Sequence, residues 1–213
     1  MCIDFSNVAA VAWLPVFEEK RARYERTLVM QGNCAYAAGL ALLMAHDGRA
    51  ADWFRRAAAR WRESWDSGAP PDAWGRPIGA LKASLLAGDD AAVEQIASWT
   101  LELGTATADS PIGRYAAVVA LLSLRRTAEA GHVAGTLRGE VFPRDVTDAL
   151  EAIAAGDGDV YAQALASVVR SFETRDAFLE DVRVADTALV LDLLARRSGI
   201  ERDLPASDVL PAA

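Results

Sequence analysis

The sequence predicts an all-α protein with a single domain over residues 1–213, and three observations support this prediction. Alanine, the strongest helix former, supplies 44 of the 213 residues, whereas Ile and Thr, which favour strands, are few. Apolar residues recur at helical spacing in segments that Gly, Asp and Pro separate. Several segments begin with a capping residue, as at Ser110-Pro111. An apolar share of 52% and a charged share of 24% are typical of a globular chain.

The first helix is expected to begin after a cap at Asp4 or Ser6 and to end near Met30. Pro15 is expected to kink this helix or to open a second segment. The charged side chains at residues 18–26 are interpreted as a solvated face with weak ion pairs.

The segment Gln31-Gly32-Asn33 is expected to end the first helix, because Gly and Asn are weak helix formers. Asn33 is a favourable cap for a second helix at residues 34–45, which is apolar nearly all round and must be buried on more than one side. After a short turn, residues 49–65 predict an amphipathic helix. The strongest break in the chain follows at residues 67–71.

The remaining periodic segments predict further helices at residues 78–86, 91–103, 112–126, 129–137, 144–155, 160–172 and 182–197. Three intervening turns resemble one another, with Ala45, Ala87 and Ala155 at corresponding places, 42 and 68 residues apart. This spacing is typical of helix-hairpin repeats such as the tetratricopeptide repeat (TPR). The sequence therefore predicts an irregular array of α-α hairpins forming a TPR-like superhelix, with a compact antiparallel bundle as the alternative.

A proline-containing tail follows the last predicted helix. Its prolines exclude a helix through the apolar residues Leu204, Val209 and Leu210. Because burial of these side chains is favourable, we expect the tail to dock against the preceding helices.

The charge and the apolar runs restrict the partners and the compartment. A formal net charge of −8 and a pI near 4.8 disfavour binding to nucleic acid, because an acidic protein repels phosphate. Cys2 and Cys34 cannot form a disulfide framework, which suits a reducing compartment. The longest apolar runs, at 35–45 and 115–124, are shorter than the roughly 18–20 residues that span a bilayer. We expect a cytoplasmic protein with no membrane partner.

No residue pattern predicts catalysis, a metal site or a cofactor. His46 and His132 lack a neighbouring nucleophile pattern and are interpreted as structural. Asp157-Gly158-Asp159 lacks the Gly and Glu of a calcium loop and is interpreted as the end of one helix and the cap of the next. Asp186 and Asp192, six residues apart on one helix, should point to opposite sides. A catalytic carboxylate pair is therefore disfavoured, and at least one of the two is expected to face water.

Tryptophan is concentrated in one part of the chain, with four of six residues between Trp53 and Trp74. Trp53, Trp61 and Trp65 fall within an arc of about 120° on a helix, which predicts a packing face. The alternative is an exposed aromatic patch with charged edges, typical of binding hot spots. On that alternative a protein partner contacts the end of this helix and a projecting loop at residues 67–74. The residues expected there are Trp61, Arg62, Trp65, Asp66 and Trp74.

The last predicted helix ends in residues 188–200, which read Ala-Leu-Val-Leu-Asp-Leu-Leu-Ala-Arg-Arg-Ser-Gly-Ile. After its glycine comes a short tail, in which residues 204–211 read Leu-Pro-Ala-Ser-Asp-Val-Leu-Pro. This ending resembles the immunity protein 49 family, all-α proteins of bacterial polymorphic-toxin loci whose members are predicted to neutralise toxins by binding them. The resemblance implies a non-enzymatic immunity protein with a toxin domain as its partner, and it implies no catalytic residues. The acidic balance is compatible with a basic toxin. A TPR-like adaptor or scaffold protein is the alternative.

Overall fold

A computed structural model describes the backbone of residues 5–212 and the side chains from Val16 onward. In this part of the chain every regular element is helical, which confirms the all-α prediction. The elements are α1 (Phe5–Met44), α2 (Ala50–Asp66), α3 (Gly75–Leu86), α4 (Asp90–Glu102), η1 (Thr105–Thr107), α5 (Pro111–Ser123), α6 (Thr127–Gly135), α7 (Arg144–Ala155), α8 (Gly158–Glu173), η2 (Leu179–Asp181) and α9 (Asp186–Arg197).

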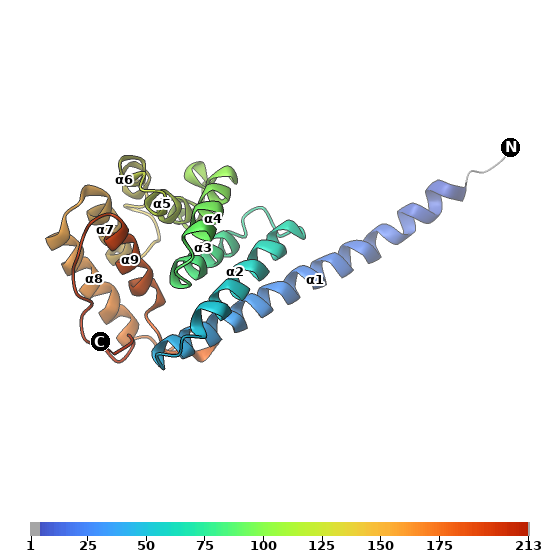
Figure 1. Ribbon diagram of the computed structural model, residues 1–213. Helices are drawn as coiled ribbons and strands as arrows, with labels where there is room; N and C mark the ends of the chain where they lie inside the picture. The colour runs from blue at the N-terminus through green and yellow to red at the C-terminus, as the bar shows by residue number, and fades with distance from the viewer. Residues whose placement is uncertain (1–4, 213) are drawn as a thin grey trace.

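The helices form an array of hairpins, and the last helix, α9, packs across this array and closes it. From α1 to α8, each helix packs against the next one in the chain, and the hairpins follow one another around an arc (Figure 1). Helix α9 then turns back and contacts α3, α5, α7 and α8. Because α3, α5 and α7 are the first helices of their hairpins, α9 lies over the face that an open helical repeat protein uses as its concave surface.

Helix α5 lies at the centre of this arrangement. Ten of its thirteen residues are buried, and it contacts helices on several sides. The hydrophobic core is one cluster that runs from Ala35 in α1 to Leu210 in the tail. A helix that is apolar all round requires this kind of enclosure.

The prediction that the first helix ends at residues 31–33 is wrong, because α1 continues through these residues without a break. Gly32 serves close packing rather than a turn. A Cβ atom at this position would lie 2.7 Å from the indole Nε1 of Trp61. Asn33, expected to cap a new helix, instead accepts a hydrogen bond of 3.2 Å from the same Nε1. The glycine and the asparagine therefore accommodate α2, and neither ends α1.

Other helix boundaries follow the expected capping chemistry. Ser110 Oγ accepts a hydrogen bond of 3.2 Å from the backbone N–H of Ile112 at the start of α5. Asp157 accepts two backbone hydrogen bonds at the start of α8, which confirms its interpretation as a helix cap. The expected cap Asp4 lies outside the described residues, and α1 continues through Pro15.

The N-terminal part of α1 extends beyond the end of α2 (Figure 1). All side chains from Val16 to Tyr24 are exposed, but Glu25 is only 5% exposed. The prediction that Glu25 belongs to a solvated face is therefore wrong. Without the predicted break, the helical stretch Val16–Met44 contains an 18-residue window that is apolar enough to cross a membrane, with a mean hydropathy of 1.3. A core helix of a folded domain meets the same criterion, and this helix packs along α2.

The tail after α9 is docked, as predicted. Val209 and Leu210 are buried, at 0% and 3% exposure, and Leu204 is half-buried against the core. The carbonyl oxygen of Val209 accepts a hydrogen bond of 2.8 Å from the backbone N–H of Ala185, just before α9. The tail therefore fixes the point at which the chain enters α9.

We expect Leu210→Ala to lower the free energy of unfolding by about 2–5 kcal/mol, because it removes a buried aliphatic side chain. The control Asp208→Ala removes an exposed ion pair with Arg183 and should cost less than about 1 kcal/mol. Urea denaturation measures both variants, and equal stabilities would contradict docking of the tail.

We also expect Gly32→Ala to lower the free energy of unfolding by about 1–3 kcal/mol, because the new methyl group overpacks against Trp61. This loss would exceed the helix-propensity gain of about 1 kcal/mol. Gly131→Ala in α6 is the matched control, since its Cβ would meet only Ala154, at 3.5 Å. The control should be neutral or stabilising by up to about 1 kcal/mol in the same urea titration. A stabilising Gly32→Ala would refute the packing role.

Candidate functional site

The structure divides the predicted partner-binding residues into a buried part and a surface part. Trp61 belongs to the core, at 5% exposure, and its ring lies 5.3 Å from that of Tyr36, centroid to centroid. Gly79 of α3 also approaches this ring, since a Cβ there would come within 2.7 Å of it. The packing interpretation therefore holds for Trp61, which is not accessible to a partner.

Trp65 and Trp74 are half-buried and pack against each other. Their rings are stacked, with centroids 5.8 Å apart, and Trp65 meets Trp99 of α4 edge to face at 6.0 Å. Trp74 also lies against α5, where a Cβ at Gly113 would be 3.0 Å from its Nε1. The connection at residues 67–74 is thus held against the helices by its last residue instead of projecting freely, as the sequence had suggested.

Arg62 and Asp66 lie at the surface, as predicted. The Arg62 guanidinium lies over the ring of Trp99, 4.1 Å from its centroid, and its Nε is 3.1 Å from Asp66 Oδ2. An arginine over an aromatic ring has a defined orientation and retains donors for another partner. These two residues border the feature that we consider the candidate binding surface.

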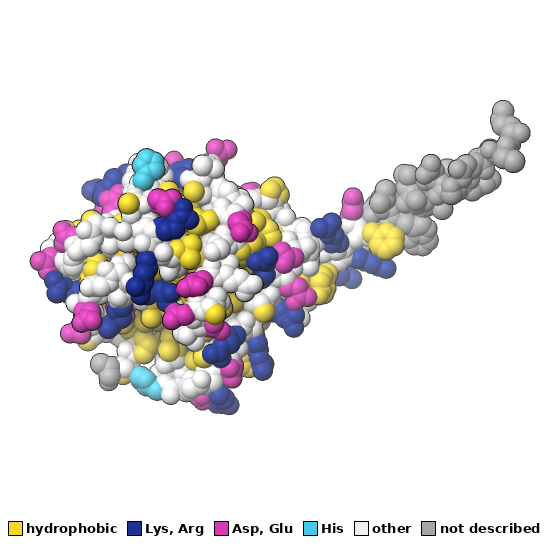
Figure 2. Space-filling view, turned by 45° about the horizontal axis from the view of Figure 1, so that its top comes forward, with side chains coloured by type: hydrophobic (Ala, Val, Ile, Leu, Met, Phe, Trp, Pro, Cys, Tyr) yellow, Lys and Arg dark blue, Asp and Glu magenta, His cyan; other side chains and the backbone are white. Residues whose placement is uncertain are grey.

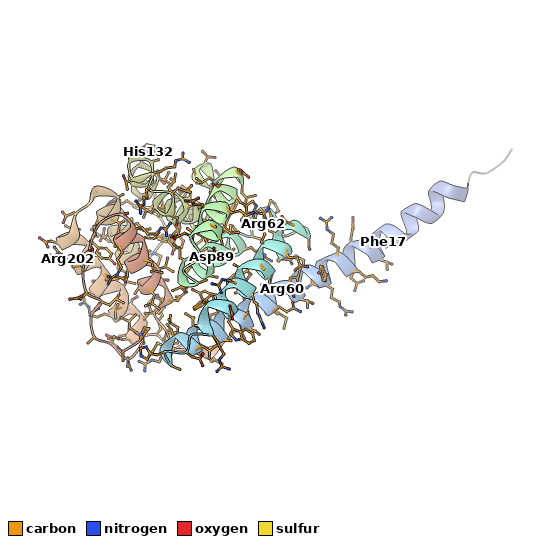
Figure 3. The ribbon with its side chains drawn as sticks, viewed as in Figure 1. Phe17, Arg60, Arg62, Asp89, His132 and Arg202 are labelled. Carbon is orange, nitrogen blue, oxygen red and sulfur yellow. The ribbon has the colours of Figure 1, made fainter. Side chains whose placement is uncertain are left out.

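That feature is a groove of about 680 Å³ between α2 and α4, which we call the α2–α4 groove. Its least exposed lining residues are Ala58, Ser84 and Ile96, with Ala59 and Ala92 beside them. Charged and polar residues complete the lining: Arg55, Arg62, Glu63, Asp66, Ser67, Asp89 and Gln95. Figure 3 labels Arg62 on α2 and Asp89 before α4. The groove thus combines a floor of small side chains with edges that carry both signs of charge.

Ion pairs organise the edges of the α2–α4 groove. Arg55 bonds Asp52 on its own helix at 2.8 Å and approaches Asp89 at 3.5 Å, which links α2 to the start of α4. Sequence reasoning found Arg62 and Asp66 through their tryptophan neighbours. It missed the α4 side, because no local pattern indicates that Ala92 and Ile96 lie opposite α2.

A second centre, not predicted, joins α1, α3 and α9. Lys82 Nζ pairs with Asp186 Oδ2 and donates a hydrogen bond of 3.2 Å to Thr187 Oγ1. Tyr36 Oη donates a hydrogen bond of 3.0 Å to the same Asp186 oxygen. Lys82 and Asp186 are mostly buried, with side chains 12% and 18% exposed. Lys82 is one of only two lysines in the chain, against 20 arginines, a contrast that could have drawn attention to it.

The charges at this centre are stable at neutral pH. Burial raises the pKa of Tyr36 well above 10.0, and the neighbouring Asp186 raises it further. Burial opposes ionisation of Asp186, but the charge and hydrogen bond of Lys82, together with hydrogen bonds from Tyr36 and the backbone of Thr187, outweigh it, so the pKa of Asp186 is lowered from 3.8. Burial likewise opposes the charge on Lys82, and the attraction of Asp186 prevails and raises the pKa of Lys82. The centre is therefore suited to holding elements together more than to exchanging protons near pH 7.

Asp192, considered with Asp186 as a carboxylate pair, belongs to a different contact. Its Oδ2 lies 2.9 Å from Arg196 Nε, and the residue is only 8% exposed. Neither aspartate points freely into water, contrary to expectation, because Asp192 is buried and Asp186 is only partly exposed, each beside its own cation. The two do not share a site.

A further buried polar contact lies nearer the N-terminus. Ser64 Oγ donates a hydrogen bond of 2.8 Å to Glu25 Oε1, and Arg76 Nε donates one of 3.1 Å to the same oxygen. These residues come from α2, α1 and α3 respectively. The contact satisfies a buried carboxylate where a sequence pattern indicated only solvated charge.

The remaining candidates for chemistry are dispersed. His132 is exposed on α6 (Figure 3), and His46 lies in a left-handed turn after α1, with φ of 53°. Cys34 is a free, exposed thiol, and Cys2 lies outside the described residues. Among the residues that the structure describes, no group of three or more His, Cys, Asp or Glu side chains is placed to hold a metal ion. Positive and negative side chains are mixed on the face in Figure 2.

Comparisons of this chain with models of known protein families, with curated proteins and with solved structures find no match.

Asp186→Asn should lower the free energy of unfolding at pH 7 by about 3–5 kcal/mol, because it leaves the Lys82 ammonium buried without its counterion. Since the pKa of Asp186 is lowered in the folded state, its stabilising contribution is present above the ordinary value of 3.8 and is lost as the pH falls through the lowered pKa. The wild type should therefore lose stability in acid more steeply than the variant.

Urea titrations across this pH range measure both slopes. Asp159→Asn, which breaks an exposed pair with Arg202, is the control and should cost less than about 1 kcal/mol. If both aspartate variants cost the same, the buried pair is not what holds α9 in place.

Proposed function

We propose that this protein is a non-enzymatic immunity protein that neutralises a toxin domain by binding it directly, with the α2–α4 groove as the contact surface. The observation that carries this proposal is the groove itself, a depression of about 680 Å³ floored by small side chains and edged by charges of both signs. The C-terminal resemblance to the immunity protein 49 family supports the kind of partner.

The composition of the groove suits a protein segment. Small residues such as Ala58 and Ala92 let the side chains of a partner approach the two helices closely, while Arg62 and Asp66 can set the orientation of the bound segment. Amphipathic helices are recognised in grooves of this kind through apolar anchors spaced along one face. The edge charges already have partners within this chain, so a toxin segment would exchange ion pairs rather than bury isolated charges.

The closed fold favours this surface over the one that adaptor proteins of the TPR kind use. In an open helical repeat protein, the first helices of the hairpins line the concave binding surface. Here α3, α5 and α7 contact α9 instead. The α2–α4 groove, which includes residues from the second helices of two hairpins, remains accessible. The net charge of −8 adds long-range attraction for a basic toxin domain.

The proposal is tested by producing the chain together with the C-terminal toxin domain of a secreted protein encoded beside its gene. Wild-type protein should restore growth and bind the purified, inactivated toxin domain in isothermal titration calorimetry. Ala59→Arg places a long side chain in the groove and should weaken binding by roughly 30-fold or more, the equivalent of losing a hot-spot contact of about 2 kcal/mol.

Ala128→Arg is the matched control, because Ala128 is an exposed helical alanine on α6, outside the groove. It should bind as the wild type does, and both variants should retain their helical circular dichroism. Rescue that survives Ala59→Arg would remove the groove from the proposal. A neighbouring toxin domain that the wild type neither binds nor neutralises would overturn the function itself.

A further inference from the structure

A cavity of about 370 Å³ lies beneath the connection between α8 and α9, and the function proposed above does not involve it. It is lined mainly by apolar side chains of that connection and of α1 and α8, among them Leu40, Phe172, Phe178 and Val184. Lys82, Arg175, Asp186 and Thr187 supply its polar groups. The cavity thus combines an apolar wall with an about equally extensive group of polar atoms, an arrangement that can orient an amphipathic small molecule.

The charges in this cavity do not balance. Lys82 and Asp186 neutralise each other, whereas Arg175 forms no ion pair with any residue from 16 to 212. The Arg175 guanidinium stacks on Phe172, with its carbon 3.6 Å from the ring centroid, and it repels Lys82 electrostatically. Arg175 is exposed, so water solvates its charge, but an arginine positioned on an aromatic ring at the edge of the cavity and beside a lysine can pair with an anion that enters there.

Donors for that anion are available. Lys82 carries three N–H donors, and Asp186 and Thr187 engage two of them. The Arg175 side chain makes only one hydrogen bond within the described residues, a long one of 3.5 Å to Ser171 Oγ. A carboxylate can accept from both cations at once, because each of its oxygens has two acceptor sites.

The turn that follows Leu179, a residue of the cavity lining, has an unusual backbone conformation. Glu180 and Asp181 of η2 both have left-handed backbones, with φ of 49° and 58°, which residues other than glycine rarely adopt. This turn directs the chain so that Leu179 lines both this cavity and a neighbouring one of about 250 Å³. Such strained conformations concentrate at binding sites and persist only where the surroundings hold them.

We propose that this cavity binds a small organic acid, with its carboxylate between Lys82 and Arg175 and an apolar body against Phe178 and Val184. The size fits a small molecule, since one water molecule takes up about 30 Å³ in the liquid and the cavity has room for about a dozen such volumes. The apolar walls distinguish this ligand from inorganic anions, which would leave them without contacts.

Isothermal titration calorimetry of the full chain with benzoate and with octanoate tests the proposal. At least one of these probes should bind saturably at a ratio of one to one. Arg175→Gln should weaken that binding by about 10–100-fold, the loss expected for a hydrogen bond between charged groups. Leu179→Trp, which fills the cavity from its partly exposed wall, should abolish binding. Neither variant replaces Lys82 or Asp186, and the melting temperature of each unliganded variant shows whether a loss of binding is separate from a loss of stability.

Arg170→Gln is the matched control, an exposed arginine on α8 outside the cavity lining, and it should bind as the wild type does. Benzamide and inorganic phosphate complete the test, since one lacks the charge and the other lacks the apolar body. Failure of both acids to bind, phosphate binding as tightly as the acids, or binding unchanged by Arg175→Gln would each overturn the proposal. None of these outcomes bears on the α2–α4 groove, which shares no lining residue with the cavity.

Discussion

The buried contact of Asp186 with Lys82 and Tyr36 is the interaction on which the closed form of this fold depends. It joins the beginning, the middle and the end of the helical array, because its residues come from α1, α3 and α9. Two opposite charges that are largely removed from water are costly to separate, because each would then be buried without a counterion. The tail reinforces the arrangement by bonding the backbone at Ala185, directly before Asp186. Helix α9 is thereby held along α3, α5 and α7.

Local signals in the sequence were sufficient for most of the helices. The helix predicted at residues 144–155 has those bounds in the structure, and the caps at Ser110 and Asp157 lie where their side-chain chemistry requires. Gly32 was misread because glycine has two uses that one sequence cannot separate. It ends a helix where the backbone must turn, and it continues a helix where another side chain must come close. Only the position of Trp61, fixed by tertiary packing, distinguishes these cases.

The candidate site was predictable only where its residues are close together in the chain. Arg62 and Asp66 could be found because they share a helix with Trp65, but the α4 side of the groove depends on how two helices that are not consecutive lie beside each other. The burial of Glu25 was hidden for the same reason. A carboxylate in a run of charges indicates solvent, and its partners Ser64 and Arg76 are far along the chain. Buried polar contacts of this kind are set by three-dimensional proximity and leave no periodic trace.

The return of α9 across the first helices also limits how this fold can evolve. Open helical repeat proteins gain or lose whole hairpins readily, because each unit touches only its neighbours. Here an added or deleted hairpin between α3 and α9 would change the distance between Asp186 and Lys82. The two charges would then be buried without forming their ion pair. The number of hairpins is therefore constrained by one ion pair. Change in this lineage should accumulate on the outer helices and in their loops, while the repeat count stays constant.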